Sequence, residues 1–245
     1  MTFYVVYRAP RNNKKRGIIP SELRSLGCIQ LHKSLWEVQE EKTKKVLQIL
    51  QKHEPILLRR TREIRKPEWN RNGVVTDIGS LSIIAYNIPN NKRKVVNRAL
   101  WKTPCIRLCR AVYAFPQRHT TIDKNKPADA ILNLIQTNEG DAKVIPRIVI
   151  EDSASIQQVV NEIEERIKQE ASDIILLSER LSIKIKENGN NMADSAEKLA
   201  NLKQKYSMLK KVANEYEKWL KLNFSKNILK TYRTIKKTND LIEQD

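Results

Sequence analysis

The sequence predicts an α+β protein in which two tandem copies of one small domain precede a helical hairpin or bundle. Three observations support this fold class. A stretch from Tyr4 to Gln39 is repeated from Ile83 to Gln117. In both copies short apolar runs alternate with amphipathic segments, and after Asp152 the pattern changes to long helical stripes. The expected parts are a first domain at 1–66, a linker at 67–81, a second domain at 82–151 and helices at 152–245.

The repeat is carried by matched residues. Tyr7 matches Tyr86 and Pro10 matches Pro89 at an offset of 79 residues. At an offset of 77 the matched pairs are Leu23 with Leu100, Cys28 with Cys105, Ile29 with Ile106 and Leu31 with Leu108. A two-residue difference in one loop reconciles the offsets, which indicates a tandem duplication.

The first copy predicts six elements in the order β-α-β-β-α-β. Phe3–Tyr7 is rich in β-branched and aromatic residues, as strands are. Gly27 stands where a helix over Ile18–Leu26 would stop. Glu40–Lys52 has its apolar residues on one side, which favours a helix. The other strands are expected at Cys28–His32, Ser34–Val38 and Ile56–Leu58. This order is that of a ferredoxin-like domain.

The second copy predicts the same order. Its strands are expected at Ser82–Tyr86, Cys105–Cys109, Ala111–Phe115 and Val144–Ile150. Its helices are expected at Lys92–Trp101 and Asp129–Gln136. Two such domains would pair their sheets or pack face to face.

The rest of the chain predicts long helices. Apolar residues from Ile156 to Ile185 keep a helical spacing, and those from Leu199 to Leu220 alternate spacings of three and four. Asn188–Asn191 interrupts the pattern. We therefore expect two antiparallel helices over 156–222 and a last helix from Lys226 to Ile242.

The formal charge of +18 is concentrated in the repeats. Residues 1–66 carry 16 Lys and Arg against 6 acids, and residues 79–150 carry 12 against 4. Residues 151–245 are nearly balanced, with 17 against 16. Such an excess favours a polyanionic partner, nucleic acid first, and DNA before RNA.

Several function classes are disfavoured by composition. No run of about 18 apolar residues occurs, so we expect no membrane span. Three cysteines without a paired framework favour a reducing, cytoplasmic location. Six glycines provide no phosphate-cradling loop, which argues against an NTPase. The histidines have no Ser or Cys partner in a recognisable motif, so no catalytic residue is assigned.

A metal site is also disfavoured. Cys105, Cys109 and His119 do not follow the ligand spacing usual for zinc. Cys28 matches Cys105 through the repeat but has no second cysteine near it. A cysteine that recurs where a strand enters a core is typically a small buried apolar residue. We expect neither a metal nor another cofactor.

The candidate phosphate-binding residues lie in basic segments. Those that follow the first strand of the first copy are Arg8, Arg11, Lys14, Lys15 and Arg16. Those in the same place of the second copy are Lys92, Arg93, Lys94 and Arg98. A third group ends the first copy with Arg59, Arg60, Arg62, Arg65 and Lys66. Phosphates need such donors, and a solvated surface is the alternative explanation. Nothing specifies a base code, so backbone or shape reading is expected.

Two family resemblances follow from these blocks. The pattern IIAYNIPNNKRKVVNRAL followed by CIRLCRAVYAF resembles the ferredoxin-like CRISPR-associated nuclease of spacer acquisition and its regulator relatives. Those nucleases hold a metal through an Asp at the end of the first strand. The matching positions here are Arg8 and Asn87, so the resemblance implies the fold without that chemistry.

The block LRSLGCIQLHKSLWEV, followed by a helical segment that contains Trp219, is similar to the N-terminal region of ChrB-type chromate-resistance regulators. This resemblance implies a DNA-binding transcription regulator. The chain differs from that family in carrying two ferredoxin-like copies.

These observations favour a non-enzymatic, cytoplasmic nucleic-acid-binding protein. The first alternative is a structural or interaction protein that forms homo-oligomers through its C-terminal helices. The second is a divergent metal-dependent nuclease.

Overall fold

The computed structural model describes residues 2–8, 17–117, 127–187 and 192–244. The chain forms two compact units, Met1–Val160 and Asn161–Asp245, here called unit 1 and unit 2. The predicted α+β fold class and the helical C-terminal region are confirmed. In the described part of the chain no helix is long and apolar enough to cross a membrane.

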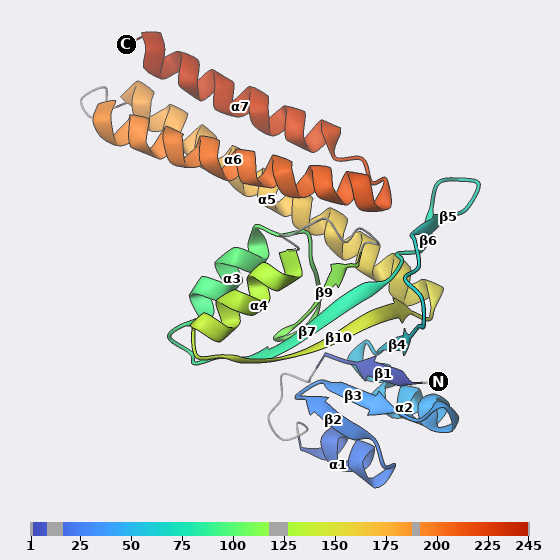
Figure 1. Ribbon diagram of the computed structural model, residues 1–245. Helices are drawn as coiled ribbons and strands as arrows, with labels where there is room; N and C mark the ends of the chain where they lie inside the picture. The colour runs from blue at the N-terminus through green and yellow to red at the C-terminus, as the bar shows by residue number, and fades with distance from the viewer. Residues whose placement is uncertain (1, 9–16, 118–126, 188–191, 245) are drawn as a thin grey trace. The chain divides into compact units, whose positions relative to one another are not determined.

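The first repeat of unit 1 covers residues 2–60 and has the order β-α-β-β-α-β (Figure 1). Its strands are β1 (Phe3–Val6), β2 (Ile29–His32), β3 (Leu35–Val38) and β4 (Ile56–Arg60). Its helices are α1 (Ile18–Ser25) and α2 (Thr43–Leu50), and 3-10 turns flank α2 at Glu40–Lys42 and Gln51–His53. Helix α1 ends where predicted, because Gly27 follows it with a positive φ of 75°.

The second repeat covers residues 81–150 and has the same order. Its strands are β7 (Leu81–Asn87), β8 (Ile106–Cys109), β9 (Val112–Pro116) and β10 (Asp141–Ile150). Its helices are α3 (Arg93–Trp101) and α4 (Pro127–Thr137). All six elements predicted for each repeat are therefore present, with ends shifted by a few residues.

The two repeats share one antiparallel sheet of eight strands, in the order β2-β3-β1-β4-β10-β7-β9-β8. Strand β10 joins them, because its early residues pair with β7 and its last three, Ile148 to Ile150, pair with β4. The register shifts between Ile145 and Ile148, where Arg147 has a φ of 60°. A bulge of this kind bends a strand, which allows β10 to serve both repeats.

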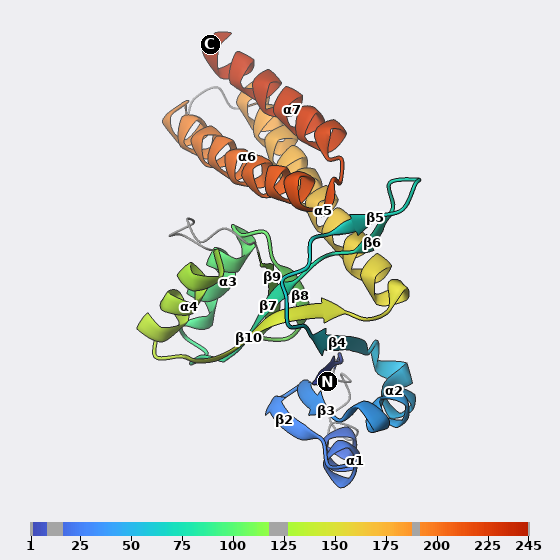
Figure 2. The same ribbon diagram turned by 45° about the vertical axis from the view of Figure 1, so that its right-hand side comes forward.

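Each repeat buries one sheet face under its two helices (Figures 1 and 2). In the first repeat Val5 and Trp36 of the sheet pack with Leu23 of α1 and Leu50 of α2. In the second repeat the equivalent core is formed by Ile84, Phe115, Val96, Leu100 and Ile135. Tyr7 and Tyr86 lie in these two matched cores, as do Cys28 and Cys105. The matched Tyr and Cys residues, and Leu23 with Leu100, are thus matched core positions, whereas Ile29 is exposed and its match Ile106 is buried.

The opposite sheet face is buried as well. Val6, Leu35 and Leu58 of the first repeat are fully buried there, as are Leu81 and Ile83 of the second. A strand that is buried on both faces has consecutive apolar residues instead of alternating ones. This explains Val5–Val6 in β1 and Ile83–Ile84 in β7.

The segment that the sequence indicated as a polar linker contains a hairpin, β5 (Glu68–Trp69) and β6 (Val75–Asp77). Asn70 forms its turn, because its Oδ1 atom accepts hydrogen bonds from the backbone of Asn72 and Val74. Gly73 completes the turn with a φ of 76°. Asn70 and Gly73 are residues that favour turns, but the polar composition of the segment led to its prediction as a linker.

Unit 2 is helical. It contains most of α5 (Ser153–Glu187), together with α6 (Met192–Leu220) and α7 (Ser225–Gln244). Helices α5 and α6 are antiparallel, because Arg166 near the start of α5 donates to the Tyr216 hydroxyl near the end of α6, at 3.2 Å. The two long helices and the last helix are confirmed. The predicted turn at 188–191 lies outside the described residues.

Candidate nucleic-acid interface

The ends of β1 and β7, where the candidate basic segments begin, meet at one end of unit 1. His32 ends β2, and the backbone N–H of Tyr7 donates to Ser34 in the adjacent turn, at 3.2 Å. The His32 Nε2 atom lies 3.1 Å from the carbonyl oxygen of Tyr86 and 3.2 Å from the Asn87 Oδ1 atom. His32 of the first repeat therefore contacts the second repeat at the end of β7.

A reciprocal contact lies beside this one. Cys109 is the repeat equivalent of His32, and Arg8 is the equivalent of Asn87. Arg8 is close enough to Cys109 to lower the pKa of its thiol, although burial dominates and raises that pKa to about 12. Matched positions of the two repeats therefore lie close together at this junction.

The junction has no reactive protonation state. Burial raises the pKa of the Cys109 thiol to about 12, so the thiol stays protonated at neutral pH. Burial lowers the pKa of His32, which leaves its ring neutral. The ring donates from Nε2, and its buried Nδ1 atom has no hydrogen-bond partner. Within the described ranges no cluster of three metal-binding side chains occurs.

Cations surround this junction, which we call the strand-exit end. Four of them act on the pKa values of its buried groups. Arg8 and Arg107 lower the pKa of Cys109, Arg93 and Arg107 lower that of Tyr86, and Lys33 lowers that of His32. No carboxylate is among the causes of these three shifts. The strand-exit end is therefore rich in cations, of which Lys33 and Arg107 are exposed.

Helix α3 continues this basic surface. Lys92 caps the helix, Arg93 and Lys94 form its first turn, and Arg98 follows one turn later. None of these four cations forms an ion pair with a described acid. Trp101 is 57% exposed and lies one heptad after Lys94. Residues spaced four and seven apart share one helix face, so two cations and an aromatic ring line the outside of α3.

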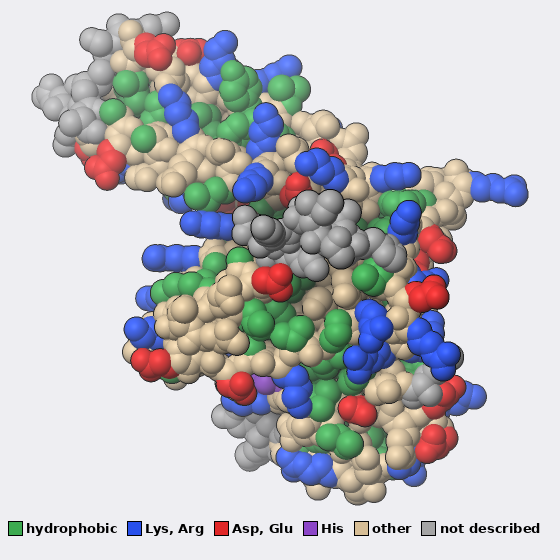
Figure 3. Space-filling view, in the orientation of Figure 1, with side chains coloured by type: hydrophobic (Ala, Val, Ile, Leu, Met, Phe, Trp, Pro, Cys, Tyr) green, Lys and Arg blue, Asp and Glu red, His purple; other side chains and the backbone are tan. Residues whose placement is uncertain are grey.

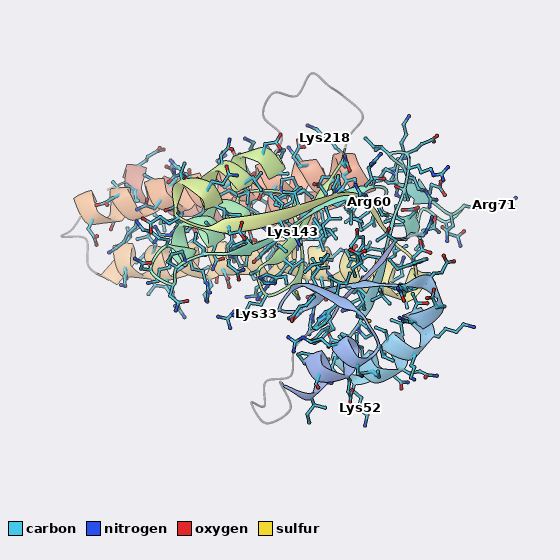
Figure 4. The ribbon with its side chains drawn as sticks, turned by 60° about the horizontal axis from the view of Figure 1, so that its bottom comes forward. Lys33, Lys52, Arg60, Arg71, Lys143 and Lys218 are labelled. Atoms are coloured by element: carbon cyan, nitrogen blue, oxygen red, sulfur yellow. The ribbon has the colours of Figure 1, made fainter. Side chains whose placement is uncertain are left out.

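The third predicted group lies elsewhere. Strand β4 is antiparallel to β1, so Arg59, Arg60 and Arg62 follow the opposite end of the strands. Arg59 forms an ion pair with Glu151, in which its Nε atom lies 2.5 Å from a carboxylate oxygen. Figure 4 labels Arg60 and Lys33, which come from these two ends of the sheet. The structure thus separates this group from the other two.

The other predicted residues either have a partner or lie outside the described residues. Arg8 forms an ion pair with Glu54, with its Nη1 atom 2.7 Å from Oε2, and both side chains are about half exposed. Arg11, Lys14, Lys15 and Arg16 lie outside the described residues. His119 also lies outside them.

Sequence reasoning missed three cations of the strand-exit end. Lys33 and Arg110 are repeat equivalents at an offset of 77, and each stands exposed in the turn between the second and third strand of its repeat. Arg107 is exposed on β8. The candidate residues came only from the segments that follow the first strands and from the end of the first repeat. Applying the offset of 77 residues to the turns would have identified Lys33 and Arg110 as well.

No family model, curated protein or solved structure matches the chain. The resemblances to the CRISPR-associated nuclease and to ChrB-type regulators therefore stay predictions.

Proposed function

We propose that the protein is a non-enzymatic nucleic-acid-binding protein, with unit 1 as its binding platform. In this proposal the two repeats are ferredoxin-like domains. Their strand order, with the fourth strand beside the first and then the third and second, supports that assignment. The ligand is the phosphate backbone, and duplex DNA is its preferred form. A transcription-regulating role like that of ChrB-type proteins is compatible with this binding.

The observation that carries the proposal is the set of cations at the strand-exit end. It contains Lys33, Arg93 and Arg107, drawn from both repeats, together with Arg8, which pairs with Glu54, and α3 extends it. Unit 1 carries 29 Lys and Arg against 14 Asp and Glu, whereas unit 2 carries 17 against 14. A phosphate chain that neutralises such cations releases counterions, which drives binding without base recognition.

Helix α3 adds two features suited to this ligand. Its start combines three cations, Lys92, Arg93 and Lys94, with the positive end of the helix dipole, and both attract phosphate. Trp101 offers an exposed ring, and stacking on an aromatic ring contributes about 1–3 kcal/mol per base in single strands. Single-stranded nucleic acid is therefore expected to bind as well.

The test is a titration of the full chain against duplex DNA, single-stranded DNA and RNA at about 50 mM and about 200 mM salt. Changing Lys92, Arg93 and Lys94 together to Ala should weaken binding for all sequences alike. It should also reduce the slope of log affinity against log salt by roughly 0.9 per lost contact on B-DNA. The same is expected of a Lys14, Lys15 and Arg16 triple variant.

A matched control changes Lys44, Lys45 and Lys52 to Ala. These three exposed cations lie on and after α2, and their removal causes the same loss of charge. The control should leave the salt slope nearly unchanged. Equal slopes in the wild type and both test variants would show that these segments are only solvated surface.

A second candidate function is an interaction protein that assembles through its C-terminal helices. Leu176 and Ile183 favour it, because they lie one heptad apart on α5 and are 46% and 54% exposed. Light scattering across a concentration series tests it. A monomer at all concentrations would exclude self-assembly, and nucleic-acid binding without assembly would favour the first proposal. Hydrolysis assays with and without divalent metal test the divergent-nuclease alternative.

A further inference from the structure

Helix α7 of unit 2 has a narrow stripe of cations. Lys226, Lys230, Arg233 and Lys237 follow one another at spacings of four, three and four residues. At about 100° per residue these positions fall on one line along the helix. All four residues are exposed. We call this set the α7 stripe.

The stripe lies on the side of α7 that faces away from its own unit. The packed side contains Thr231, Ile235 and Thr238, which are 0%, 4% and 0% exposed. The hydroxyl of Thr238 lies 2.7 Å from the Ser178 Oγ atom of α5, which fixes this side against the bundle. The stripe residues lie about half a helical turn away from these positions, and Figure 3 shows blue side chains over α7.

Some cations of unit 2 are neutralised within their own helices. On α5 and α6 these include Lys168, which pairs with Glu165, and Lys218, which pairs with Glu215. Lys198 likewise pairs with Asp194. In the part of unit 2 that the structure describes, no residue of the α7 stripe has an ion-pair partner. Four like charges held in a line repel one another, and a polyanion would relieve that repulsion.

We propose that the α7 stripe is a second phosphate-binding site, which lies along the backbone of a nucleic-acid duplex. Its 11-residue span is about 16 Å long at 1.5 Å per residue. Duplex DNA carries one negative charge per about 1.7 Å of its axis, so a line of cations of this length meets several phosphates. The proposal rests on the proposed nucleic-acid function and assigns part of the binding to unit 2.

The geometry favours nucleic acid over an anionic membrane surface. A helix that lies in a membrane interface buries its apolar side in the bilayer. In α7 that side is already buried in the bundle by Thr231, Ile235 and Thr238. The exposed Leu229 and Tyr232 border the stripe on one side only. Tyr232 also packs near Tyr206 of α6, with ring centroids 6.1 Å apart.

A second site changes the strength of binding through linkage. When one unit is bound, the other meets the same nucleic acid at a high effective concentration, so overall affinity rises without a new contact. Loss of the stripe should therefore weaken binding of long duplexes more than binding of short ones that fill only one site.

The test compares two triple variants of the full chain on a long DNA duplex. The first changes Lys230, Arg233 and Lys237 to Ala. The control changes Lys205, Lys210 and Lys211 to Ala, which are exposed lysines of α6 that do not share one helix line. Alanine favours helix, so circular dichroism should show unchanged helix content in both.

The stripe variant should lower the salt slope by roughly 2 to 3 and the affinity by about tenfold or more, with a much smaller change in the control. Equal behaviour of the two variants would overturn the inference and leave the proposed function intact. Binding that fails in the stripe variant but survives the Lys92, Arg93 and Lys94 variant would support the inference and contradict the unit 1 site. Stripe-dependent binding to anionic vesicles without binding to DNA would overturn it in favour of a membrane surface.

Discussion

The two repeats of unit 1 have the same core and different outer surfaces. Leu23 and Leu100 occupy equivalent buried positions on α1 and α3. The outward line of α3 contains Lys94, Arg98 and Trp101. At the equivalent positions α1 and the residue before it have Gly17, Ser21 and Arg24.

The side chain of Arg24 is also engaged within its own repeat. It donates to the Gln30 Oε1 atom at 2.7 Å, and its guanidinium carbon lies 5.8 Å from the centre of the Trp36 ring. The two repeats therefore have similar residues at the buried positions of these helices, whereas their exposed residues differ in charge. Of the two outer helices, α3 is the one suited to phosphate.

The largest effect is expected in the shared core. Leu23→Ala and Leu100→Ala should each lower the free energy of unfolding by about 2–5 kcal/mol, because each leaves a cavity under a helix. Urea unfolding of the two variants measures this. Val95→Ala, at a residue 44% exposed, serves as control and should cost much less. A large cost in only one repeat would break the equivalence of the two cores.

The junction between the repeats should also be sensitive. His32→Ala should cost about 1–3 kcal/mol, because it leaves the Tyr86 carbonyl oxygen of a buried hydrogen bond without its donor. Cys109→Ala, at the equivalent position, should cost less, since a thiol makes weak hydrogen bonds, such as that to the Arg110 carbonyl at 3.9 Å. Chemical unfolding at neutral pH compares them, and equal costs would contradict the asymmetry of the junction.

The same pair should differ in pH dependence. Burial lowers the pKa of His32, so at mildly acidic pH the unfolded chain binds a proton that the folded chain does not. The stability that His32 contributes is present above its ordinary pKa of about 6.5 and declines as the pH falls below it. His32→Gln should flatten this decline between neutral and mildly acidic pH. An unchanged pH profile in that variant would show that His32 does not titrate on unfolding.

A smaller effect is expected at the end of α1. Gly27 has a φ of 75°, and the Lys42 Nζ atom would lie 3.2 Å from a Cβ atom placed there. Gly27→Ala should cost about 1 kcal/mol. Gly17→Ala is the matched control, because Gly17 has an ordinary φ and no atom within 4 Å of the added group. Thermal melts measure the effect. If both variants unfold at the wild-type midpoint, the positive φ of Gly27 does not require glycine.

The smallest effect on stability is expected where the repeats differ most. Arg98→Ser gives α3 the residue that α1 has at Ser21, and with Lys94→Ala it removes two exposed cations. Stability should change by within about 0.5 kcal/mol. Nucleic-acid affinity should fall in the same variant. A loss of stability without a loss of affinity would make these residues structural instead of functional.

Much of the fold was predictable because its signals are local. The strands of each repeat follow from β-branched runs, and α1 ends at Gly27 because only a residue that tolerates positive φ fits there. The apolar stripes of α5 and α6 and the length of α7 follow from helical spacing. The hairpin at 68–77 was missed, because a two-residue strand carries too short a pattern to be recognised.

The candidate site was predictable only in part. The cations after the first strands were visible as basic segments, and the sequence matched Arg8 to Asn87. The repeat, the order of elements, the core residues and the excess of positive charge could all be predicted from the sequence. Each of these features depends on residues that are close together along the chain. The tertiary structure alone decided that the bulge at Arg147 lets β10 serve both repeats, and that His32 meets Asn87. It also decided that Arg59 to Arg62 fall at the far end of the strands. Strand pairing and bending set these relations between residues distant in sequence, and no local pattern encodes them.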